Sequence, residues 1–253
     1  MSVSNRIRFV LVGTQHTGNI GAAARAMKTM GLSRLSLVAP EQALDEVAYR
    51  RCAGAEDVLG AAPVFATLAE AVADCHWILG CTARSRRIQL QELLPAVAGQ
   101  RAVARAGESA QVAFVFGRER TGLSNEELQL CHAAVHIPSD PQFSSLNLAA
   151  AVQVLAYEVR VAQLQDAPAA AAIEPSEYGQ CAASHAQLEG LFGQLGQTLE
   201  RIDFHKGRAP ESAMRKLRRL FMKAGLSEQE VRLLRGILSD AQRIMKSNGE
   251  LQN

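Results

Sequence analysis

Three small polar side chains, Ser144, Ser145 and Asn147, stand where a long apolar helix is predicted to begin within residues 137–159. A helix N-terminus presents free backbone N–H groups and the positive end of the helix dipole, which together can bind phosphate, carboxylate or ribose hydroxyl groups. Serine and asparagine are also favoured N-caps. Because one cap residue is enough and three are present, the pattern leaves capping and ligand binding about equally open.

A second polar segment, residues 13–21 (GTQHTGNIG), follows a predicted buried strand and leads into an alanine-rich helix. It lacks the GK[ST] of a P-loop and the GxGxxG of a dinucleotide site. Asn19 lies near the helix start. Arg25 is either a surface cation or a functional group, and the alanines around it favour a function. His16 is interpreted as an ordinary loop histidine, since no metal-ligand partners accompany it.

Two further loops follow predicted strands, and ligands of open α/β sheets bind at that edge. Residues 80–87 (GCTARSRR) form either a phosphate-binding edge or a solvated basic loop. In residues 117–124 (GRERTGLS), Glu119 could orient a hydroxyl group, or it could simply pair with the neighbouring Arg118 or Arg120.

The sequence contains no GxSxG or HExxH motif and no cluster of histidine and cysteine, so we expect neither a covalent nucleophile nor a metal. Arginine, asparagine, serine and glutamate on small loops instead favour positioning of reactants and stabilisation of charge. The five scattered cysteines indicate reduced thiols in a cytoplasmic protein. We find no signal peptide and no membrane span.

The elements that must position these loops form an α/β pattern. We predict strands at 7–12, 34–38, 76–80, 111–116 and 134–137, with helices at 19–30, 44–51, 67–73 and 124–131 between them, and the long apolar helix after the last strand. Capping boxes, Thr67–Glu70 and Ser124–Glu127, open the helices at 67–73 and 124–131. Consecutive strand–helix–strand units indicate a parallel sheet with right-handed crossovers. We predict a domain at 1–164, a linker at 165–183 that contains two prolines, and a helical extension at 184–253. The extension is predicted to hold three helices: one from Ser184 onward, one at about 212–224, and one that opens with the capping box Ser227–Glu230.

The net charge of +2 implies that any nucleic-acid surface is local. The helical extension holds a basic cluster that is balanced only by Glu211. Such a cluster is typical of an RNA-backbone footprint, and a solvated helix face is the alternative. Its members, with Lys223 at the end of the run, are Lys206, Arg208, Arg215, Lys216, Arg218 and Arg219.

The segments TGNIGAAARAMKTMG, FVFGRERTGLSNEEL and IPSDPQFSSLNLAAAVQVLAYEV resemble the three motifs of the SpoU-type 2′-O-ribose methyltransferases of the SPOUT superfamily. The resemblance covers residues 7–164. The tail around KGRAPESAMRKLRRLF resembles that of bacterial tRNA methyltransferases that act on cytidine or uridine at position 32 of the anticodon loop.

This resemblance implies a C-terminal trefoil knot, one of the rare exceptions to unknotted topology, with helices on both faces of the sheet. It also implies a homodimer, tRNA as substrate, and S-adenosylmethionine as the methyl donor. The implied cofactor residues are Cys81, Thr82, Ala83, Gly117, Ile137, Ser144, Ser145 and Leu146. The implied catalytic residues are Asn19, Arg25, Glu119, Ser145 and Asn147, and we add Arg84, Arg86 and Arg87 as RNA contacts.

Arg25 corresponds to an arginine that has been proposed as the general base of the family. Because a guanidinium stays protonated in proteins, we prefer a role in orienting the phosphate and the hydroxyl group. The alternatives are methylation of another tRNA or rRNA nucleotide, and an RNA-binding protein without catalysis. A dehydrogenase is disfavoured because the glycine fingerprint and the ribose-binding acid are missing.

Overall fold

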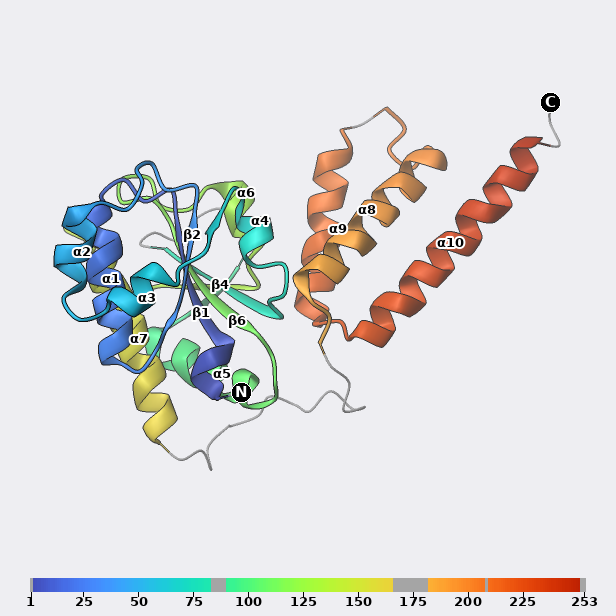
Figure 1. Cartoon of the computed structure of the whole chain (residues 1–253). Helices are drawn as coiled ribbons and strands as arrows, with labels where there is room; N and C mark the ends of the chain where they lie inside the picture. Colours follow the sequence, from blue (N-terminus) through green and yellow to red (C-terminus); the bar gives the residue numbers. More distant parts are fainter. Residues whose placement is uncertain (1, 83–89, 166–181, 208, 251–253) are drawn as a thin grey trace. The chain divides into compact units, whose positions relative to one another are not determined.

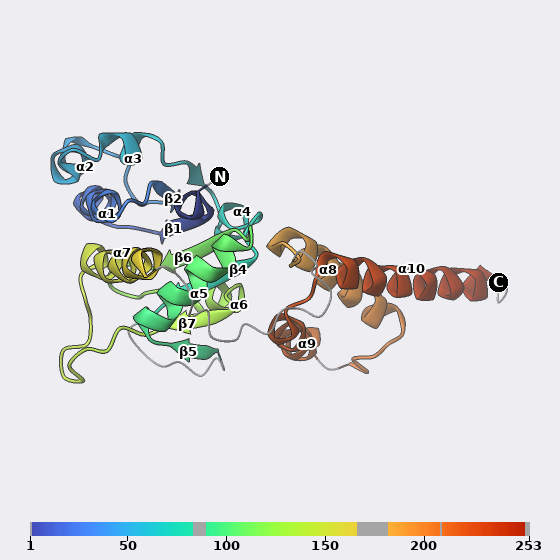
Figure 2. The same ribbon diagram turned by 90° about the horizontal axis from the view of Figure 1, so that it is seen from below.

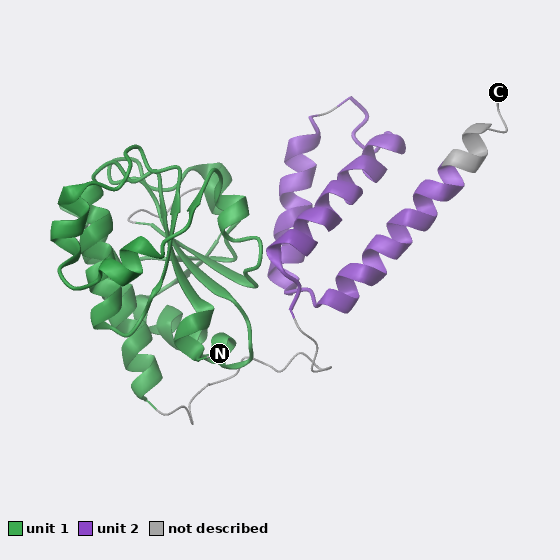
Figure 3. Ribbon diagram, in the orientation of Figure 1, with its two compact units in different colours: residues 1–173 green, residues 174–253 purple. Residues whose placement is uncertain are grey.

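The computed structural model describes residues 2–82, 90–165, 182–207 and 209–250. The chain divides into two compact units, residues 1–173 and 174–253 (Figure 3). This division falls inside the predicted linker, most of which lies outside the described residues, so the linker bounds stay a prediction. Each unit is described by itself.

The first unit is built on a seven-stranded sheet in the order β3-β2-β1-β6-β4-β7-β5, and every neighbouring pair is parallel. The predicted α/β fold with a parallel sheet is therefore confirmed, and Figure 1 shows the strands at the centre of the unit. After a short 3-10 helix, Val3–Arg6, the strands are β1 (Ile7–Val12), β2 (Arg34–Val38), β3 (Val64–Phe65), β4 (Trp77–Cys81), β5 (Gln91–Leu93), β6 (Val112–Phe116) and β7 (Ala133–Val135).

Helices cover both faces of this sheet, because successive side chains of each strand point to opposite faces. Phe9 and Leu11 of β1 pack in one core with α1 (Thr17–Thr29), α5 (Pro95–Gly107) and α7 (Leu148–Leu164). Val10 and Val12 pack in a second core with α4 (Leu68–Ala71) and α6 (Asn125–Gln129). Figure 2 shows the layers, with α2 (Glu46–Cys52) and α3 (Glu56–Gly60) beside α1.

The start of the long apolar helix differs from the prediction. The helix α7 begins at Leu148, and Asn147 is its N-cap, with the side-chain Oδ1 accepting hydrogen bonds from the backbone N–H groups of Ala149 and Ala150. Ser144 and Ser145 therefore lie in the preceding loop and not in the first turn of the helix. The capping boxes at Thr67 and Ser124 are confirmed, each with its glutamate three residues later.

The strands β3 and β5 and the helices α3 and α5 were not among the predicted elements. Small residues dominate the buried face of α5, and Pro95 marks its first turn. Its packing depends on close approach: a Cβ atom on Gly99 would lie 2.8 Å from the carbonyl carbon of Glu158 in α7. The trefoil knot implied by the resemblance stays a prediction.

The second unit contains the three predicted helices, α8 (His185–Arg201), α9 (Pro210–Ala224) and α10 (Glu228–Glu250). The predicted capping box at the start of α10 is present, because Ser227 and Glu230 each accept a hydrogen bond from the other's backbone N–H. Within the described parts of the chain, no helix has the length and apolar character needed to cross a membrane. The small core of this unit consists of Ala183, Leu188, Leu191, Phe192, Met222 and Val231.

Candidate active site

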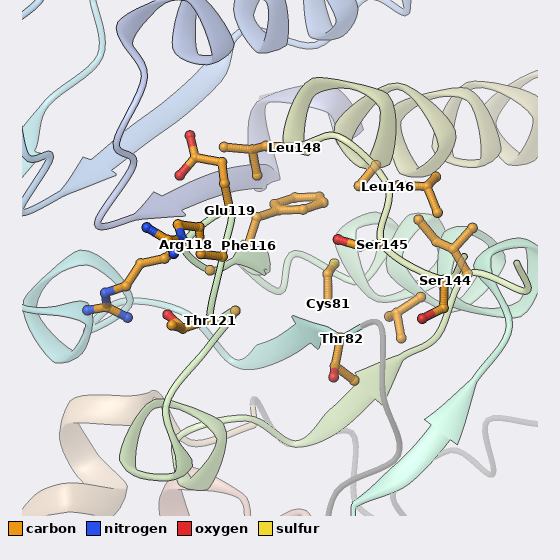
Figure 4. Close-up of a pocket in the computed structure, with 16 residues that line it drawn as sticks. Cys81, Thr82, Phe116, Arg118, Glu119, Thr121, Ser144, Ser145, Leu146 and Leu148 are labelled. Carbon is orange, nitrogen blue, oxygen red and sulfur yellow. The ribbon is translucent and has the colours of Figure 1, made fainter. Parts of the chain in front are cut away.

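A pocket opens where β4, β6 and β7 end, and these three strands are neighbours in the sheet. The carboxyl edge of a parallel sheet is the usual place for a ligand in this type of fold. The space inside the pocket, including its open mouth, is about 960 Å³. Its walls combine apolar side chains from the strand ends with polar groups from the loops (Figure 4).

Most of the predicted cofactor residues lie together in this pocket. Ala83 is the exception, since it lies outside the described residues. Figure 4 shows the loop that precedes α7 on one side of the pocket and the strand end at Thr82 on another. The predicted residues that line the pocket are Cys81, Thr82, Gly117, Ile137, Ser144, Ser145 and Leu146.

The loop after β6 is a tight turn that is closed by two backbone hydrogen bonds. The N–H of Arg118 donates to the carbonyl of Gly122 at 3.2 Å, and the N–H of Gly122 donates to the carbonyl of Arg118 at 2.8 Å. A Cβ atom on Gly117 would lie 2.1 Å from the carbonyl carbon of Gly122, so only glycine fits there. The closed turn directs Glu119 and its two successors to the pocket.

Glu119 joins this turn to the loop after β1. Its carboxylate accepts hydrogen bonds from the backbone N–H groups of Gln15, at 3.0 Å, and His16, at 3.3 Å, and from Nδ2 of Asn19, at 2.9 Å. The alternative interpretation, in which Glu119 pairs with a neighbouring arginine, is wrong. Burial alone would raise the pKa of Glu119, but the hydrogen bonds from Asn19 and Gln15 outweigh it and lower that pKa.

Asn19 also connects Glu119 to the start of α7. Its side-chain nitrogen donates to Glu119, while its Oδ1 accepts a hydrogen bond from Nδ2 of Asn147 at 3.1 Å. Asn147 in turn caps α7 with its own Oδ1. The two hydrogen bonds therefore fix the orientation of the Asn19 and Asn147 side-chain amides. Together with Glu119, these residues come one from each of the three motifs. We refer to these three residues as the amide relay.

Asn147→Asp separates the two tasks of this side chain. An aspartate still accepts from the N–H groups of α7, so we expect the free energy of unfolding to stay within about 1 kcal/mol of the unmodified protein. It cannot donate to Asn19, so we expect methyl transfer to fall about tenfold or more through loss of positioning. Denaturant unfolding and single-turnover assays measure these two effects. Equal activity of the two proteins would contradict a role for the relay.

Arg118 supports the turn from outside and was not recognised from the sequence. Its guanidinium forms an ion pair with Glu127 at 3.1 Å, and Glu127 also accepts from the N–H of Ser124. The side chain lies against Gly13, where a Cβ atom would be 2.7 Å from Nε of Arg118. The signal in the sequence was the capping box, but it could not show that its glutamate would bind an arginine nine residues earlier.

Arg25 lies apart from the pocket of its own chain. It is exposed on α1, six residues after Asn19, which is about 1.7 turns and about 9 Å further along the helix. It is not among the residues that line the pocket. Hydrogen bonds join Asn19 to Glu119 and Asn147, and Ser145 lines the pocket with Glu119. Arg25 belongs to neither group.

The predicted RNA contacts differ in their surroundings. Arg84, Arg86, Arg87 and Arg208 lie outside the described residues. Arg218 is engaged within its unit, because it forms an ion pair with Glu189 and lies 4.5 Å from the ring centre of Phe192. Arg219 is half-buried and has partners of its own. The exposed predicted contacts in the second unit are Lys206, Arg215 and Lys216.

Across the described ranges, no group of three or more histidine, cysteine, aspartate or glutamate side chains is arranged to hold a metal ion. The described cysteines, Cys52, Cys75, Cys81 and Cys131, form no disulfide bonds with one another. Burial raises the pKa of the Cys81 thiol, which lines the pocket, so this side chain is a neutral wall and not a nucleophile.

Comparison with known proteins agrees with this geometry. The model of the SpoU rRNA Methylase family matches residues 6–157, and that of the tRNA methyltransferase TrmJ C-terminal domain matches residues 186–250. A relative from Yersinia pestis (strain Pestoides F), a tRNA (cytidine/uridine-2′-O-)-methyltransferase TrmJ, is 48% identical over 239 residues, which cover 94% of this chain and 92% of the relative.

A TrmJ from Escherichia coli O1:K1 / APEC is 48% identical over 242 residues, which cover 96% of this chain and 97% of that protein. The crystal structure of TrmJ from Z. mobilis ZM4 has a TM-score of 0.80 and 34% identity, and the match covers 93% of this chain and 98% of that one. One family model matches within each compact unit, and TrmJ proteins match over most of the chain. The chain therefore belongs to the SpoU methylase family.

Proposed function

We propose that this protein transfers a methyl group from S-adenosylmethionine to the ribose 2′-hydroxyl of cytidine or uridine at position 32 of tRNA. The observation that carries the proposal is the 48% identity to TrmJ proteins over 94% of the chain, which spans both units. The relatives carry the name of a tRNA cytidine/uridine 2′-O-methyltransferase. Such a substrate would place the protein in the cytoplasm.

The residues of the pocket fit this cofactor. Phe116, Val135, Ile137 and Leu146 offer apolar walls for a purine, and Ser144, with its loop neighbours, offers polar groups at the edge. When bound, S-adenosylmethionine supplies a methyl group on a positively charged sulfur atom. Glu119 also lines the pocket, together with Arg118 and Arg120.

The protein's own contribution is positioning. The amide relay holds the loops of the three motifs in one geometry, and Ser145 lines the pocket beside it. Orientation of this kind lowers a reaction barrier because the entropy cost of aligning the reacting groups is met when the substrate binds. A pocket that excludes water favours a reaction in which charge is neutralised.

We also propose that two copies of the chain form the active dimer. The helix α7 exposes two large apolar side chains, Tyr157 and Leu164, with exposed fractions of 53% and 65%. They lie seven residues apart and therefore share one face of the helix. Arg25, which lies outside the pocket of its own chain, would complete the site of the second copy, and symmetry would make the exchange mutual.

The helix α9 provides a surface for the tRNA backbone. Its outer face carries Arg215, Lys216 and Lys223, which are exposed, and Glu211 is the acidic residue in its first turn. Positive groups at helical spacing can follow the phosphates of RNA without reading its sequence. This surface would supply the affinity that a single nucleotide in the pocket cannot.

A variant with Arg215, Lys216 and Lys223 all replaced by glutamine tests this surface. Loss of three phosphate contacts is expected to weaken tRNA binding and to lower the slope of log affinity against log salt by about 2 to 3. Filter binding over a range of salt concentrations measures the slope, and calorimetry checks that cofactor binding is unchanged. Arg232→Gln, at an exposed position of α10, is the control; equal slopes in both variants would exclude α9.

Methylation of tRNA transcripts by the purified protein tests the function itself. We expect ribose methylation at position 32, mapped by mass spectrometry, and its loss in tRNA from a strain without the protein. Modification at a different tRNA or rRNA nucleotide would overturn the position. Cofactor binding in calorimetry without methylation of any RNA would favour the second candidate, an RNA-binding protein without catalysis.

A further inference from the structure

Phe143 is an exposed aromatic side chain in the loop between β7 and α7. Its exposed fraction is 84%, the highest among the large apolar side chains that the structure describes. Complete exposure of a phenyl ring forgoes about 2 kcal/mol that burial would contribute. Such a residue on the surface therefore suggests a partner that covers the ring.

The loop holds this ring in a defined place. The N–H of Gln142 donates to the carboxylate of Asp140 at 2.7 Å, and the N–H of Phe143 donates to the carbonyl of Asp140 at 3.0 Å. The hydroxyl group of Ser139 donates to the carbonyl of Ser144 at 3.0 Å and closes the base of the loop. The turn thus presents Phe143 immediately before Ser144 and Ser145, which line the pocket.

Two other partners are less suitable for this ring. The adenine of a cofactor would lie in the pocket, and Phe143 is not among the residues that line it. A protein interface would place several apolar side chains together, whereas residues 140–142 beside Phe143 are exposed aspartate, proline and glutamine. The apolar face of α7, with Tyr157 and Leu164, meets that description instead.

We propose that Phe143 stacks on an unpaired base of the substrate RNA, at or next to the nucleotide whose ribose enters the pocket. The reacting hydroxyl is on C2′ and the base is on C1′, so a ribose held beside Ser145 must place its base close to the rim. Unstacked loop bases are commonly bound on aromatic rings, and stacking accepts either pyrimidine. This inference rests on the proposed function.

Phe143→Ala, in the full-length protein, is expected to raise the KM for tRNA by about tenfold or more, as the loss of one base–aromatic stack predicts. The affinity for cofactor in calorimetry, the kcat at saturating tRNA and the mass in light scattering should stay unchanged. Phe143→Tyr should restore the KM. The salt dependence of binding should also stay the same, because stacking releases no counterions.

Phe143→Trp gives a direct readout, since the chain has a single tryptophan, Trp77, which is 5% exposed. We expect RNA to quench the fluorescence of the new indole. Val64→Ala, on the exposed edge strand β3, is the matched control for loss of a surface apolar group and should leave KM unchanged. An unchanged KM in Phe143→Ala, a loss of cofactor affinity, or a dissociated dimer would each overturn the proposal. Quenching does not depend on catalysis, so it separates this proposal from failure of the proposed function.

Discussion

Gly117→Ala is expected to remove cofactor binding almost completely. The added Cβ atom would lie 2.1 Å from the carbonyl carbon of Gly122 and 2.2 Å from the nitrogen of Leu123. Both are backbone atoms, so no side-chain rotation can relieve the clash. The turn after β6 must open to admit it, at a cost of about 3 kcal/mol. If that cost falls on the bound state, affinity drops by a factor of roughly 100 or more.

Calorimetry with S-adenosylmethionine measures the affinity, and thermal unfolding shows whether the remainder of the unit stays folded. Gly60→Ala is the matched control, since nothing lies within 4 Å of a Cβ atom at that position of α3. Alanine in a helix is more favourable than glycine by about 1 kcal/mol, so this control should be equally or more stable. Normal cofactor affinity in Gly117→Ala would show that the closed turn is not part of the site.

Glu119→Gln is expected to lower kcat/KM for methyl transfer by about 100-fold, the usual penalty for slight misplacement of reacting groups. The carboxylate accepts from three donors, on Gln15, His16 and Asn19. The glutamine side chain has the same shape as glutamate, but an NH₂ group replaces one carboxylate oxygen. This NH₂ group would face one of the three N–H donors that the carboxylate accepts from. An unsatisfied donor of this kind costs about 1 to 3 kcal/mol when buried, and partial exposure puts this case at the lower end.

The pH dependence of stability gives an independent check on Glu119. Its pKa is lowered from the usual value of 4.5 by the hydrogen bonds from Asn19 and Gln15, which outweigh burial. The stabilisation is therefore fully present above about pH 4.5, and it is lost as the pH falls through the lower pKa of the folded state. We expect the difference in unfolding free energy between the two proteins to shrink over that acidic range.

Glu126→Gln is the control for charge alone, because Glu126 is exposed in the first turn of α6. Its interaction with the helix N-terminus contributes less than about 1 kcal/mol, so activity should be retained. Activity of Glu119→Gln equal to that of this control would contradict the role of the amide relay.

Local patterns predicted the parts of the fold that depend on neighbouring residues. The strand β6 and the capping boxes at Thr67 and Ser124 were recognised from short runs of sequence. The helix α5 was missed although its buried positions recur at helical spacing, because alanine and glycine occupy most of them in place of larger apolar residues. At Gly99 the lack of a side chain allows α5 to approach α7 closely, and the amino-acid composition does not predict such a contact.

The candidate site shows the same limit. The loops were identified from their residue types, but Asn19, the side-chain partner of Glu119, is separated from it by 100 positions and was not among the alternatives that the sequence offered. The start of α7 was placed a turn too early because three residues were suitable caps, and only the backbone geometry selects Asn147. The position of Arg25 relative to a second copy depends on how two chains assemble, and short sequence patterns within one chain do not show this.

The amide relay has a consequence for the synthesis of this protein. Asn19 and Asn147 are 128 positions apart, so the first part of the site leaves the ribosome long before its last member. Contacts of such large sequence separation form late, because the intervening chain must be ordered before they can close. A nascent chain that has completed β1 and α1 therefore holds Asn19 without either of its partners. Methyl transfer begins only after the last helix of the first unit has docked, and the newly made protein is inactive until then.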